Sequence, residues 1–343
     1  MSILRFTILS LWSPIISGME DNRRATLKPI KCIVKLGGAA VTFKNEFEKI
    51  NDHNLHVLSA QLRESMKETS RSPEKEVSLD WSRNSANSDP PCDVNALENN
   101  PLLHGATLGF VIVHGAGSFG HFQASTSGVH AGGLNKPLVK AGFVATRISV
   151  ATLNNEIVRA LAHEGIPSVG LSPFSCGWSS DKINIGVGDL SVVRKSIESG
   201  FVPVVHGDAV LDNVQGCSIL SGDTITRHLA YHLNPQFVVF LTDVLGVYDR
   251  PPSDPNARLV REIVVRRDGS WSTVGAGVKT SVSAHDTTGG MAAKIAEAVA
   301  IVKMGIPVFI VKAASDHSLA ALSGQLQESI PNDWLGTIVK LKD

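Results

Sequence analysis

Residues 108–121 read LGFVIVHGAGSFGH, and this stretch decides the fold. Its first six residues form a continuous apolar run, which is typical of a strand buried on both faces of a parallel sheet. The run stops at a turn that contains three glycines and lies between His114 and His121. A buried strand that ends in a glycine-rich turn indicates an α/β protein whose polar side chains gather where the strands end.

The same pattern recurs along most of the chain. Apolar runs predict strands at residues 30–36, 108–113, 167–171, 201–205, 237–241, 307–311 and 336–341. Helical periodicity and glycine or proline stops predict helices at residues 53–66, 143–164, 189–199, 223–232 and 291–304, with one more helix before the last strand. Strands that alternate with helices form a parallel sheet covered on both faces. We therefore expect an α/β fold, a three-layer αβα sandwich with a mainly parallel central sheet.

Composition narrows the class of protein. The 343 residues contain 32 Lys+Arg and 32 Asp+Glu, so the formal net charge is zero. A general nucleic-acid binder would carry a basic excess, and no nucleic-acid partner is expected. The four cysteines show neither a CxxC spacing nor a Cys/His zinc pattern, which disfavours a disulfide scaffold and a zinc site. A reduced intracellular compartment is the expectation.

Two segments differ in composition from the rest. Residues 1–18 are largely apolar but too short and too broken by Ser13 and Pro14 to span a bilayer. We interpret residues 1–29 as an N-terminal extension, disordered or targeting-like, and expect a cytosolic (cytoplasmic) protein, with organelle import or secretion as alternatives. Residues 67–100 are rich in Ser, Asn, Pro and acidic side chains, which predicts a disordered insertion.

Two glycine-containing segments resemble nucleotide-binding motifs, but neither matches its motif fully. Residues 115–120 match G-x-G-x-x-G, but a dinucleotide site needs an acidic residue about 20 positions on, and none occurs between Gly120 and Glu156. Close approach of backbone N–H groups to an anion is the better interpretation. Residues 275–280 lack the spacing and the Gly-Lys junction of a P-loop, and we interpret them as a surface turn.

Several glycine turns nevertheless point to phosphate. Gly37-Gly38 follows the first strand, residues 115–120 follow the second, and residues 287–290 open a helix. Three such turns are more than one phosphate group needs. Phosphoryl transfer holds donor and acceptor phosphates together and neutralises them with cations and N–H groups. Lys35, Lys44 and Lys294 are the candidate cations. Zero net charge fits such a site if these lysines lie at strand ends and the acidic residues lie elsewhere.

The ordered set of motifs carries a resemblance. It consists of Lys35-Leu-Gly-Gly, the stretch from His114 to His121, His-Gly-Asp208, Ser-Gly-Asp223, Thr-Asp-Val-Leu-Gly-Val-Tyr248 and Asp-Thr-Thr-Gly-Gly-Met-Ala-Ala-Lys294. This set resembles the amino acid kinase superfamily from about residue 31 to the C-terminus, the insertion excluded. Within that superfamily, Ser-Phe-Gly-His121 is most similar to the isopentenyl phosphate kinases.

The resemblance implies an activity and an organisation. The activity would be ATP-dependent phosphorylation of isopentenyl phosphate to isopentenyl diphosphate, with Mg²⁺ bridging the ATP phosphates and dimethylallyl phosphate as a second acceptor. Residues 30–343 would form one kinase domain, with an acceptor-phosphate lobe over about 30–218 and a nucleotide lobe over about 219–343. A homodimer is also implied.

The resemblance further implies a role for each matched residue. The catalytic residues would be Lys35, Lys44, His121 and Asp223, with Asp223 orienting the lysines rather than acting as a base. ATP would be bound by Lys35, Leu36, Gly37, Gly38, Ala39, Gly117, Asp243, Tyr248, Gly289 and Lys294. The acceptor would be bound by Ala116, His121 and Gly207, and no direct protein ligand to a metal is assigned. Ala116 stands where relatives tend to have glycine.

The histidines and the acceptor class can be argued from chemistry. A monophosphate acceptor is an anion that needs hydrogen-bond donors but no general base, which suits His121, whereas His114 beside a buried strand is expected to be structural. An amino-acid acceptor would call for an arginine, and Arg147 is the candidate. Other acceptors in the superfamily are nucleotides and phosphonates, and a catalytically silent nucleotide-binding regulator is the remaining alternative. Phe119, Phe122, Val144, Ile148 and Thr152 are candidates for the wall around a prenyl tail, although core packing explains them equally well.

Overall fold

The computed structural model describes residues 29–67, 78–80, 103, 109–182, 184–274 and 290–342. Nearly all of the predicted N-terminal extension and most of the predicted insertion lie outside the described residues. So do Gly289 and the predicted surface turn 275–280.

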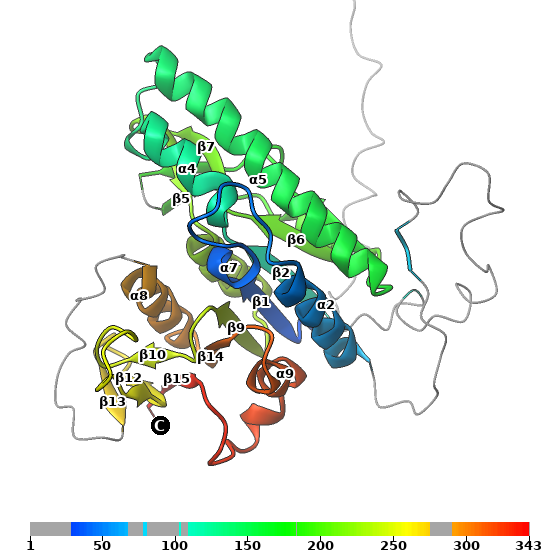
Figure 1. Cartoon of the computed structure of the whole chain (residues 1–343), viewed down its shortest axis with the longest axis vertical. Coiled ribbons are helices and arrows are strands. Elements are labelled where there is room, and N and C mark those ends of the chain that lie inside the picture. The colour runs from blue at the N-terminus through cyan, green and yellow to red at the C-terminus, as the bar shows by residue number, and fades with distance from the viewer. Residues whose placement is uncertain are drawn as a thin grey trace, which may run out of the picture.

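A nine-stranded sheet forms the centre of the molecule, in the order β13-β12-β15-β14-β9-β1-β2-β6-β3 (Figure 1). Its strands are β1 (Cys32–Leu36), β2 (Phe110–His114), β3 (Ser168–Leu171), β6 (Val202–His206), β9 (Phe237–Thr242), β12 (Glu262–Val265), β13 (Trp271–Val274), β14 (Val308–Lys312) and β15 (Thr337–Leu341). Neighbouring strands run parallel except in the β14–β15 and β12–β13 pairs. The mainly parallel sheet that the apolar runs predict is confirmed.

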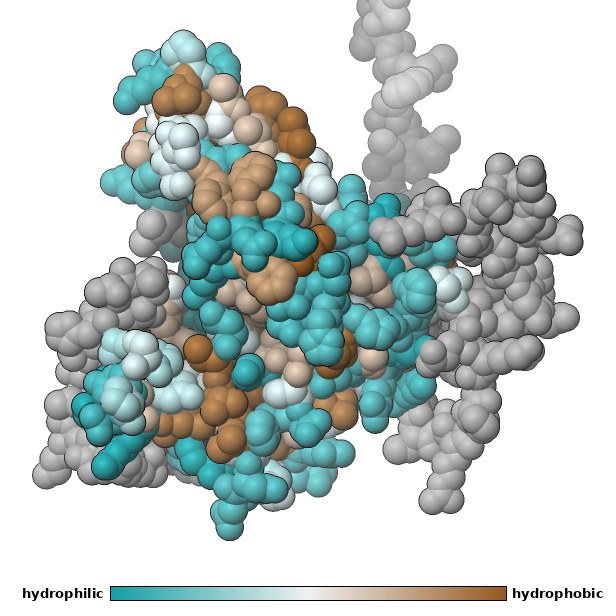
Figure 2. Space-filling model, viewed as in Figure 1, coloured by the Kyte–Doolittle hydropathy of each residue, from teal (hydrophilic) through white to brown (hydrophobic). Residues whose placement is uncertain are grey.

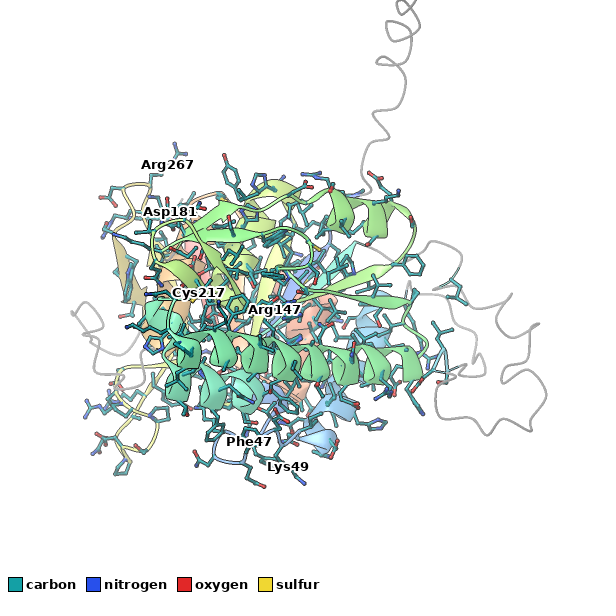
Figure 3. The ribbon with its side chains drawn as sticks, turned by 90° about the horizontal axis from the view of Figure 1, so that it is seen from above. Phe47, Lys49, Arg147, Asp181, Cys217 and Arg267 are labelled. Carbon is teal, nitrogen blue, oxygen red and sulfur yellow. The ribbon has the colours of Figure 1, made fainter. Side chains whose placement is uncertain are left out.

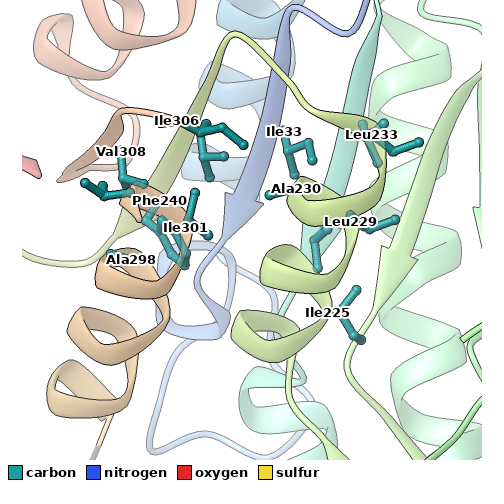
Figure 4. Close-up of a cluster of buried hydrophobic side chains, with 14 of the residues drawn as sticks. Ile33, Ile225, Leu229, Ala230, Leu233, Phe240, Ala298, Ile301, Ile306 and Val308 are labelled. Atoms are coloured by element: carbon teal, nitrogen blue, oxygen red, sulfur yellow. The ribbon is translucent and has the colours of Figure 1, made fainter. Parts of the chain in front are cut away.

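Helices cover both faces of this sheet. They are α1 (Gly38–Val41), α2 (Asp52–Met66), α4 (Gly117–Ser127), α5 (Pro137–His163), α6 (Ser191–Glu198), α7 (Gly222–Leu233), α8 (Gly290–Val302) and α9 (Asp316–Ser323), with 3₁₀ turns η1 (Val129–Ala131) and η2 (Gln325–Gln327). Successive residues of a strand point to opposite faces, so each strand feeds two cores. Ile33 of β1 packs with α7 and α8 (Figure 4), whereas Val34 packs with α2, α5 and α9. These two cores make the three-layer αβα sandwich.

Two smaller sheets, strands β12 and β13 of the central sheet, and helices α1 and α4 were not predicted. Strands β4 (Ser179–Asp181), β5 (Asn184–Val187), β7 (Asp208–Asp212) and β8 (Gly216–Leu220) form a four-stranded sheet, and β10 (Val247–Tyr248) pairs with β11 (Leu259–Val260). These strands are short and partly exposed, so they lack the apolar runs that reveal the central strands. Helix α4 begins inside the glycine turn, where its low apolar periodicity hides it.

The remaining expectations hold with shifted boundaries. Helix α5 begins at Pro137, before the predicted residue 143, because proline is well suited to the first helical turn. Within the predicted insertion, residues 78–80 are ordered against α5, where the Leu79 N–H donates to Ala162 O at 2.8 Å. The central sheet also crosses the predicted lobe boundary, because β1 pairs with both β2 and β9.

The carboxyl ends of the central strands lie side by side. Leu36, His114 and His206 are register partners across β1, β2 and β6, and Leu241 of β9 pairs with Leu36 on the other side. Ligands of α/β sheets bind at this edge, so the register fixes where the site must be. No helix among the described residues has the length and apolarity needed to cross a membrane.

Candidate active site

One cavity of about 1010 Å³ opens at the carboxyl ends of these strands. It collects most of the residues that the sequence singles out: Lys35, Gly37, Gly38, Ala39, Lys44, Ala116, Gly117, His121, Gly207, Asp223, Asp243, Tyr248 and Lys294. Leu36 is different, because its side chain is buried in the core. Any contact of Leu36 with a ligand must therefore go through its backbone, and Gly289 lies outside the described residues.

Lys35, Asp223 and Lys294 form a buried charged cluster at the floor of the cavity. Lys35 shares the face of β1 that packs under α7, where Asp223 lies in the first turn, and the two side chains form an ion pair. Lys294 of α8 approaches the same carboxylate at 3.3 Å and lies 5.2 Å from the Phe240 ring centroid. Local sequence signals do not show this contact between Lys294 and Asp223, although the resemblance implies that Asp223 orients the lysines.

Protonation in this cluster follows from burial and charge. Burial opposes ionisation of Asp223, but Lys35 and Lys294 outweigh it and hold the pKa of its carboxyl below the usual range. Burial, reinforced by the positive charge of Lys35, lowers the pKa of Lys294 to about 8. Asp223 is therefore a carboxylate near pH 7 and cannot serve as a proton donor, and Lys294 loses its proton as the pH rises through about 8.

Lys44 and Asp243 form a second, more exposed pair at the cavity mouth. Their side chains meet at 3.0 Å and are 64% and 38% exposed. Burial opposes ionisation of Asp243, but the hydrogen bond from Lys44 outweighs this effect and lowers the carboxyl pKa. An exposed lysine on a loop can move between this carboxylate and a bound anion at small cost.

The glycines of the cavity bring backbone against backbone. A Cβ on Gly38 would lie 2.5 Å from both Cα and N of Gly117, and a Cβ on Gly222 would lie 3.1 Å from His114 O. Gly117 also has a φ of +53°, which glycine adopts at the least cost. Side chains at these positions would therefore push the turns apart and fill the space where backbone N–H groups can reach an anion.

Helix N-termini add positive potential to the same space. Helices α4, α7 and α8 all begin at residues that line the cavity. The first N–H groups of a helix have no intrahelical acceptor, and the helix dipole favours anions there. In α4, the Ser118 N–H is satisfied by Thr42 Oγ1 at 3.1 Å. This hydrogen bond joins the start of α4 to the segment that follows α1.

The sequence predicts that the acidic residues lie away from the lysines at the strand ends, and this prediction is wrong. Asp208, Asp223 and Asp243 line the cavity together with the three lysines. The expectation is wrong because residues distant in sequence meet at the strand ends. Before any ligand binds, Asp223 and Asp243 neutralise the lysines, and incoming phosphates can then compete for them.

His121 and His114 occupy opposite environments. His121 is an exposed side chain on α4 that lines the cavity, and partial burial followed by the charges of Lys35 and Lys44 lowers its pKa. Its imidazole is neutral near pH 7 and can donate one N–H. His114 is fully buried, with Nδ1 at 3.0 Å from Gly115 O and Nε2 at 3.0 Å from Asn154 Nδ2. Its predicted structural character agrees with this burial.

Beyond His121 the cavity becomes apolar. The wall there consists of Ala124, Thr146, Val150 and Ile219, with His130 and Ser125 nearby. The earlier candidates for a tail-binding wall lie elsewhere: Phe119 is in the core, while Phe122, Val144, Ile148 and Thr152 are exposed. That prediction chose the wrong face of α5, since helical periodicity alone does not say which face meets the cavity.

The opposite end of the cavity is lined by Tyr248, Arg250, Pro251, Pro252 and Trp271. Of these, only Tyr248 was predicted. Trp271 lies on the antiparallel edge strand β13, which has no motif to mark it. An aromatic and proline-lined end next to the lysine cluster suits a flat heterocyclic ring attached to phosphates.

Arg147 is engaged by the protein itself. It projects from α5 (Figure 3), its Nη2 donates to Ser172 Oγ at 3.0 Å, and its Nε lies 3.4 Å from Asp208 Oδ1. Its guanidinium also lies 4.0 Å from the Phe174 ring centroid. These partners occupy the group that a carboxylate-bearing acceptor would need.

Comparison with known proteins identifies the fold family. The model of the Amino acid kinase family matches residues 101–312. The chain belongs to the amino acid kinase family. Within it, the chain is 60% identical over 322 residues to isopentenyl phosphate kinase of Arabidopsis thaliana, covering 91% of this chain and 96% of that protein. It is 35% identical over 239 residues to isopentenyl phosphate kinase of Methanothermobacter thermautotrophicus, covering 66% and 85% respectively.

Solved structures of the family agree with the architecture. An X-ray structure of isopentenyl phosphate kinase superposes with a TM-score of 0.64 at 27% identity, covering 90% of this chain and all of the other. The amino acid kinase fold that the resemblance implies is thereby confirmed.

Proposed function

We propose that this protein transfers the γ-phosphoryl group of ATP to isopentenyl phosphate, forming isopentenyl diphosphate and ADP. The observation that carries the proposal is the acceptor end of the cavity, where His121 precedes a wall formed by Ala124, Thr146, Val150 and Ile219. A phosphate-binding histidine followed by apolar side chains suits a short prenyl monophosphate. The relatives named above support the same substrate class.

The acceptor needs donors rather than a base. A phosphate monoester carries about −1.5 to −2 charge at pH 7, so its attacking oxygen is already ionised. We assign its recognition to the His121 N–H and to the backbone at Ala116, with Gly207 beside them. The exposed side chain of Lys44 can leave Asp243 and stay in contact with the phosphoryl group as it moves from ATP to the acceptor.

Transfer itself depends on charge placement. Lys35 stabilises the γ-phosphoryl group in flight, and Asp223 holds Lys35 and Lys294 in place without exchanging a proton. The backbone at Gly37, Gly38, Ala39 and Gly117 surrounds the ATP phosphates, with Leu36 contributing through its backbone. Asp243, Tyr248, Gly289 and Lys294 complete the nucleotide side, and Trp271 extends it.

Mg²⁺ fits this site as a companion of ATP. Among the described residues, no group of three or more His, Cys, Asp or Glu side chains is arranged to hold a metal ion. Asp223 and Asp243, the carboxylates nearest the lysines, are both paired. When bound, Mg²⁺ would be held chiefly through ATP rather than by protein side chains, and it would supply positive charge that neutralises the phosphates.

The alternatives fit less well. An amino-acid acceptor is disfavoured because Arg147 is bound to Ser172 and Asp208. A silent nucleotide-binding regulator is disfavoured because Lys35, Lys294 and Asp223 form an intact cluster.

A homodimer is part of the proposal. Leu138, Val144 and Ile148 of α5 are between 54% and 65% exposed, and hydrophobic side chains are visible along this helix (Figure 2). Ile148→Lys should shift the protein to a monomer in analytical ultracentrifugation if this face is the interface. The cytosolic location stays a prediction, which imaging of the full chain would test.

An acceptor panel tests the activity. The full chain is incubated with ATP, Mg²⁺ and, in separate reactions, isopentenyl phosphate, dimethylallyl phosphate, acetylglutamate or uridylate, and ADP release is measured. Isopentenyl phosphate should give the highest kcat/KM. Fastest turnover of uridylate or acetylglutamate, or turnover of none, would overturn the proposal.

A further inference from the structure

His114 lies directly behind the acceptor turn. As the last residue of β2, it belongs to the alternate positions of that strand that face α5, whereas Lys35 of β1 faces α7 and α8. Its ring is fully buried and lines no part of the cavity, so it cannot touch a substrate. Any effect of this histidine on the reaction must act through its neighbours.

The hydrogen bonds of the ring fix its tautomer. Nδ1 lies 3.0 Å from Gly115 O, and a carbonyl oxygen only accepts, so Nδ1 carries the proton. Nε2 then accepts from Asn154 Nδ2 at 3.0 Å, and the same amide group donates to Val204 O at 3.1 Å. Gly170 provides the space for this amide, because a Cβ there would lie 2.2 Å from Asn154 Oδ1.

This chain of hydrogen bonds ends at the peptide group that opens the acceptor site. No cis peptide bond occurs among the described residues, so the N–H of Ala116 points opposite to the Gly115 carbonyl. The ring pulls that carbonyl toward α5, which turns the Ala116 N–H away from α5 and toward the cavity that Ala116 lines. We propose that His114 is a positioning residue, which with Asn154 aims the Ala116 N–H at the acceptor phosphate.

The neighbouring strand repeats the arrangement. His206 of β6 is the register partner of His114, their ring centroids are 5.7 Å apart, and His206 Nδ1 donates to Gly207 O at 3.0 Å. Gly207, like Ala116, lines the cavity. Two adjacent strands thus end in a His-Gly pair whose ring binds the glycine carbonyl, which is a reason for histidine at both positions.

The ring stays neutral while it performs this task. Burial, followed by the nearby His206, lowers the pKa of His114 to about 3. A neutral ring keeps one donor and one acceptor, which matches its two partners. The acceptor turn therefore keeps the same geometry throughout the pH range in which the substrate ionises.

Matched amide variants test the inference, which rests on the proposed function of the cavity. His114→Asn keeps a donor close to the Nδ1 position, whereas His114→Gln places its amide closer to Nε2 and loses the bond to Gly115 O. His114→Gln should lower kcat/KM for isopentenyl phosphate roughly 10- to 100-fold, the range for weakening a hydrogen bond to a charged group. His114→Asn should retain most of kcat/KM, and the KM for ATP should change little in either variant.

The difference in kcat/KM between His114→Asn and His114→Gln decides whether His114 is a positioning residue. Equal losses in both, or equal effects on the KM values for acceptor and ATP, would mean that His114 only supports the fold. If the wild-type enzyme turns over no prenyl phosphate, the proposed function fails first and independently of the variants.

A measurement on the wild-type chain keeps the inference testable if the variants do not fold. Nitrogen NMR of the protein labelled with ¹⁵N-histidine distinguishes the two neutral tautomers of each ring. We expect buried rings in the Nδ1–H form that do not titrate between pH 5 and 8. Absence of any neutral Nδ1–H ring would overturn the inference.

Discussion

Lys35 and Asp223 form an ion pair where strand β1 ends and helix α7 begins, and Lys294 approaches the same carboxylate at 3.3 Å. One carboxylate thus holds two buried ammonium groups at the floor of the cavity. Without the Asp223 carboxylate, the ammonium groups of Lys35 and Lys294 would repel each other in the ligand-free protein.

Replacing Asp223 should separate binding from transfer. Asp223→Asn leaves Lys35 and Lys294 without their anion, so ATP should bind at least as tightly while kcat falls roughly 100-fold because the lysines lose their alignment. The free energy of unfolding should also fall by about 3 kcal/mol in the absence of ligand, because a buried ion pair is broken. Isothermal titration, steady-state kinetics and urea unfolding measure the three quantities.

Asp243→Asn provides the matched control for stability. Its partner Lys44 is 64% exposed, so the free energy of unfolding should change by less than about 1 kcal/mol. An Asp223→Asn enzyme with wild-type kcat would contradict the assigned role of Asp223.

Lys294 should impose a pH dependence on ATP use. Its pKa is lowered to about 8, chiefly by burial, so the free enzyme loses this positive charge as the pH rises through 8. ATP is a polyanion and binds better to the protonated lysine. Consequently kcat/KM for ATP should fall above pH 8, approaching tenfold per pH unit if this lysine dominates.

Lys294→Arg tests the origin of that slope. Arginine stays protonated throughout this range, so the variant should show a flatter profile between pH 7 and 9.5. An identical slope in both enzymes would assign the dependence to another group.

The parts predicted correctly from sequence are those with local signals. Strand β1 is recognisable because Cys32–Leu36 is apolar apart from Lys35, and a lysine at the end of a buried run needs an anionic partner. The glycine turns likewise identify a site for anions. These features depend on residues that lie next to one another along the chain.

The parts that were missed depend on long-range pairing. Strand β5 has mostly exposed residues and β4 only three residues, so neither has a signal until β7 pairs with β4. The contact between Asp223 and Lys294 spans 71 residues and depends on how α7 packs on α8. The side of α5 that lines the cavity was similarly decided by the packing of α4.

His121 should affect the acceptor far more than ATP. His121→Ala removes an N–H donor from the phosphate of the acceptor, so kcat/KM for isopentenyl phosphate should fall roughly 10- to 100-fold. His121→Gln should recover part of the loss because it restores a neutral donor. The dissociation constant of ATP should stay within about twofold of the wild-type value, a change below roughly 0.5 kcal/mol.

His130→Ala is the control within the same cavity. His130 lies near the apolar wall of the cavity and is exposed, so its loss should change kcat/KM little. If His130→Ala were the more damaging variant, the acceptor phosphate would lie at the other end of this wall.

Gly38→Ala and Gly290→Ala form a matched pair for the backbone contact that shapes the phosphate turns. Both glycines are the first residue of a helix, α1 and α8, and neither has a positive φ. A Cβ on Gly38 would lie 2.5 Å from the backbone of Gly117, whereas a Cβ on Gly290 would meet no other described residue within 4 Å. Gly38→Ala must separate α1 from α4 and should destabilise the protein by about 1–3 kcal/mol, with loss of activity.

Gly290→Ala should instead be neutral or stabilising by up to about 1 kcal/mol, because alanine restricts the unfolded chain and favours a helix. Urea unfolding of the two variants beside the wild type measures the difference. Equal stabilities would mean that the chain relaxes around Gly38 at little cost. In that case the close approach of α1 to α4 would not be what requires glycine in the first phosphate turn.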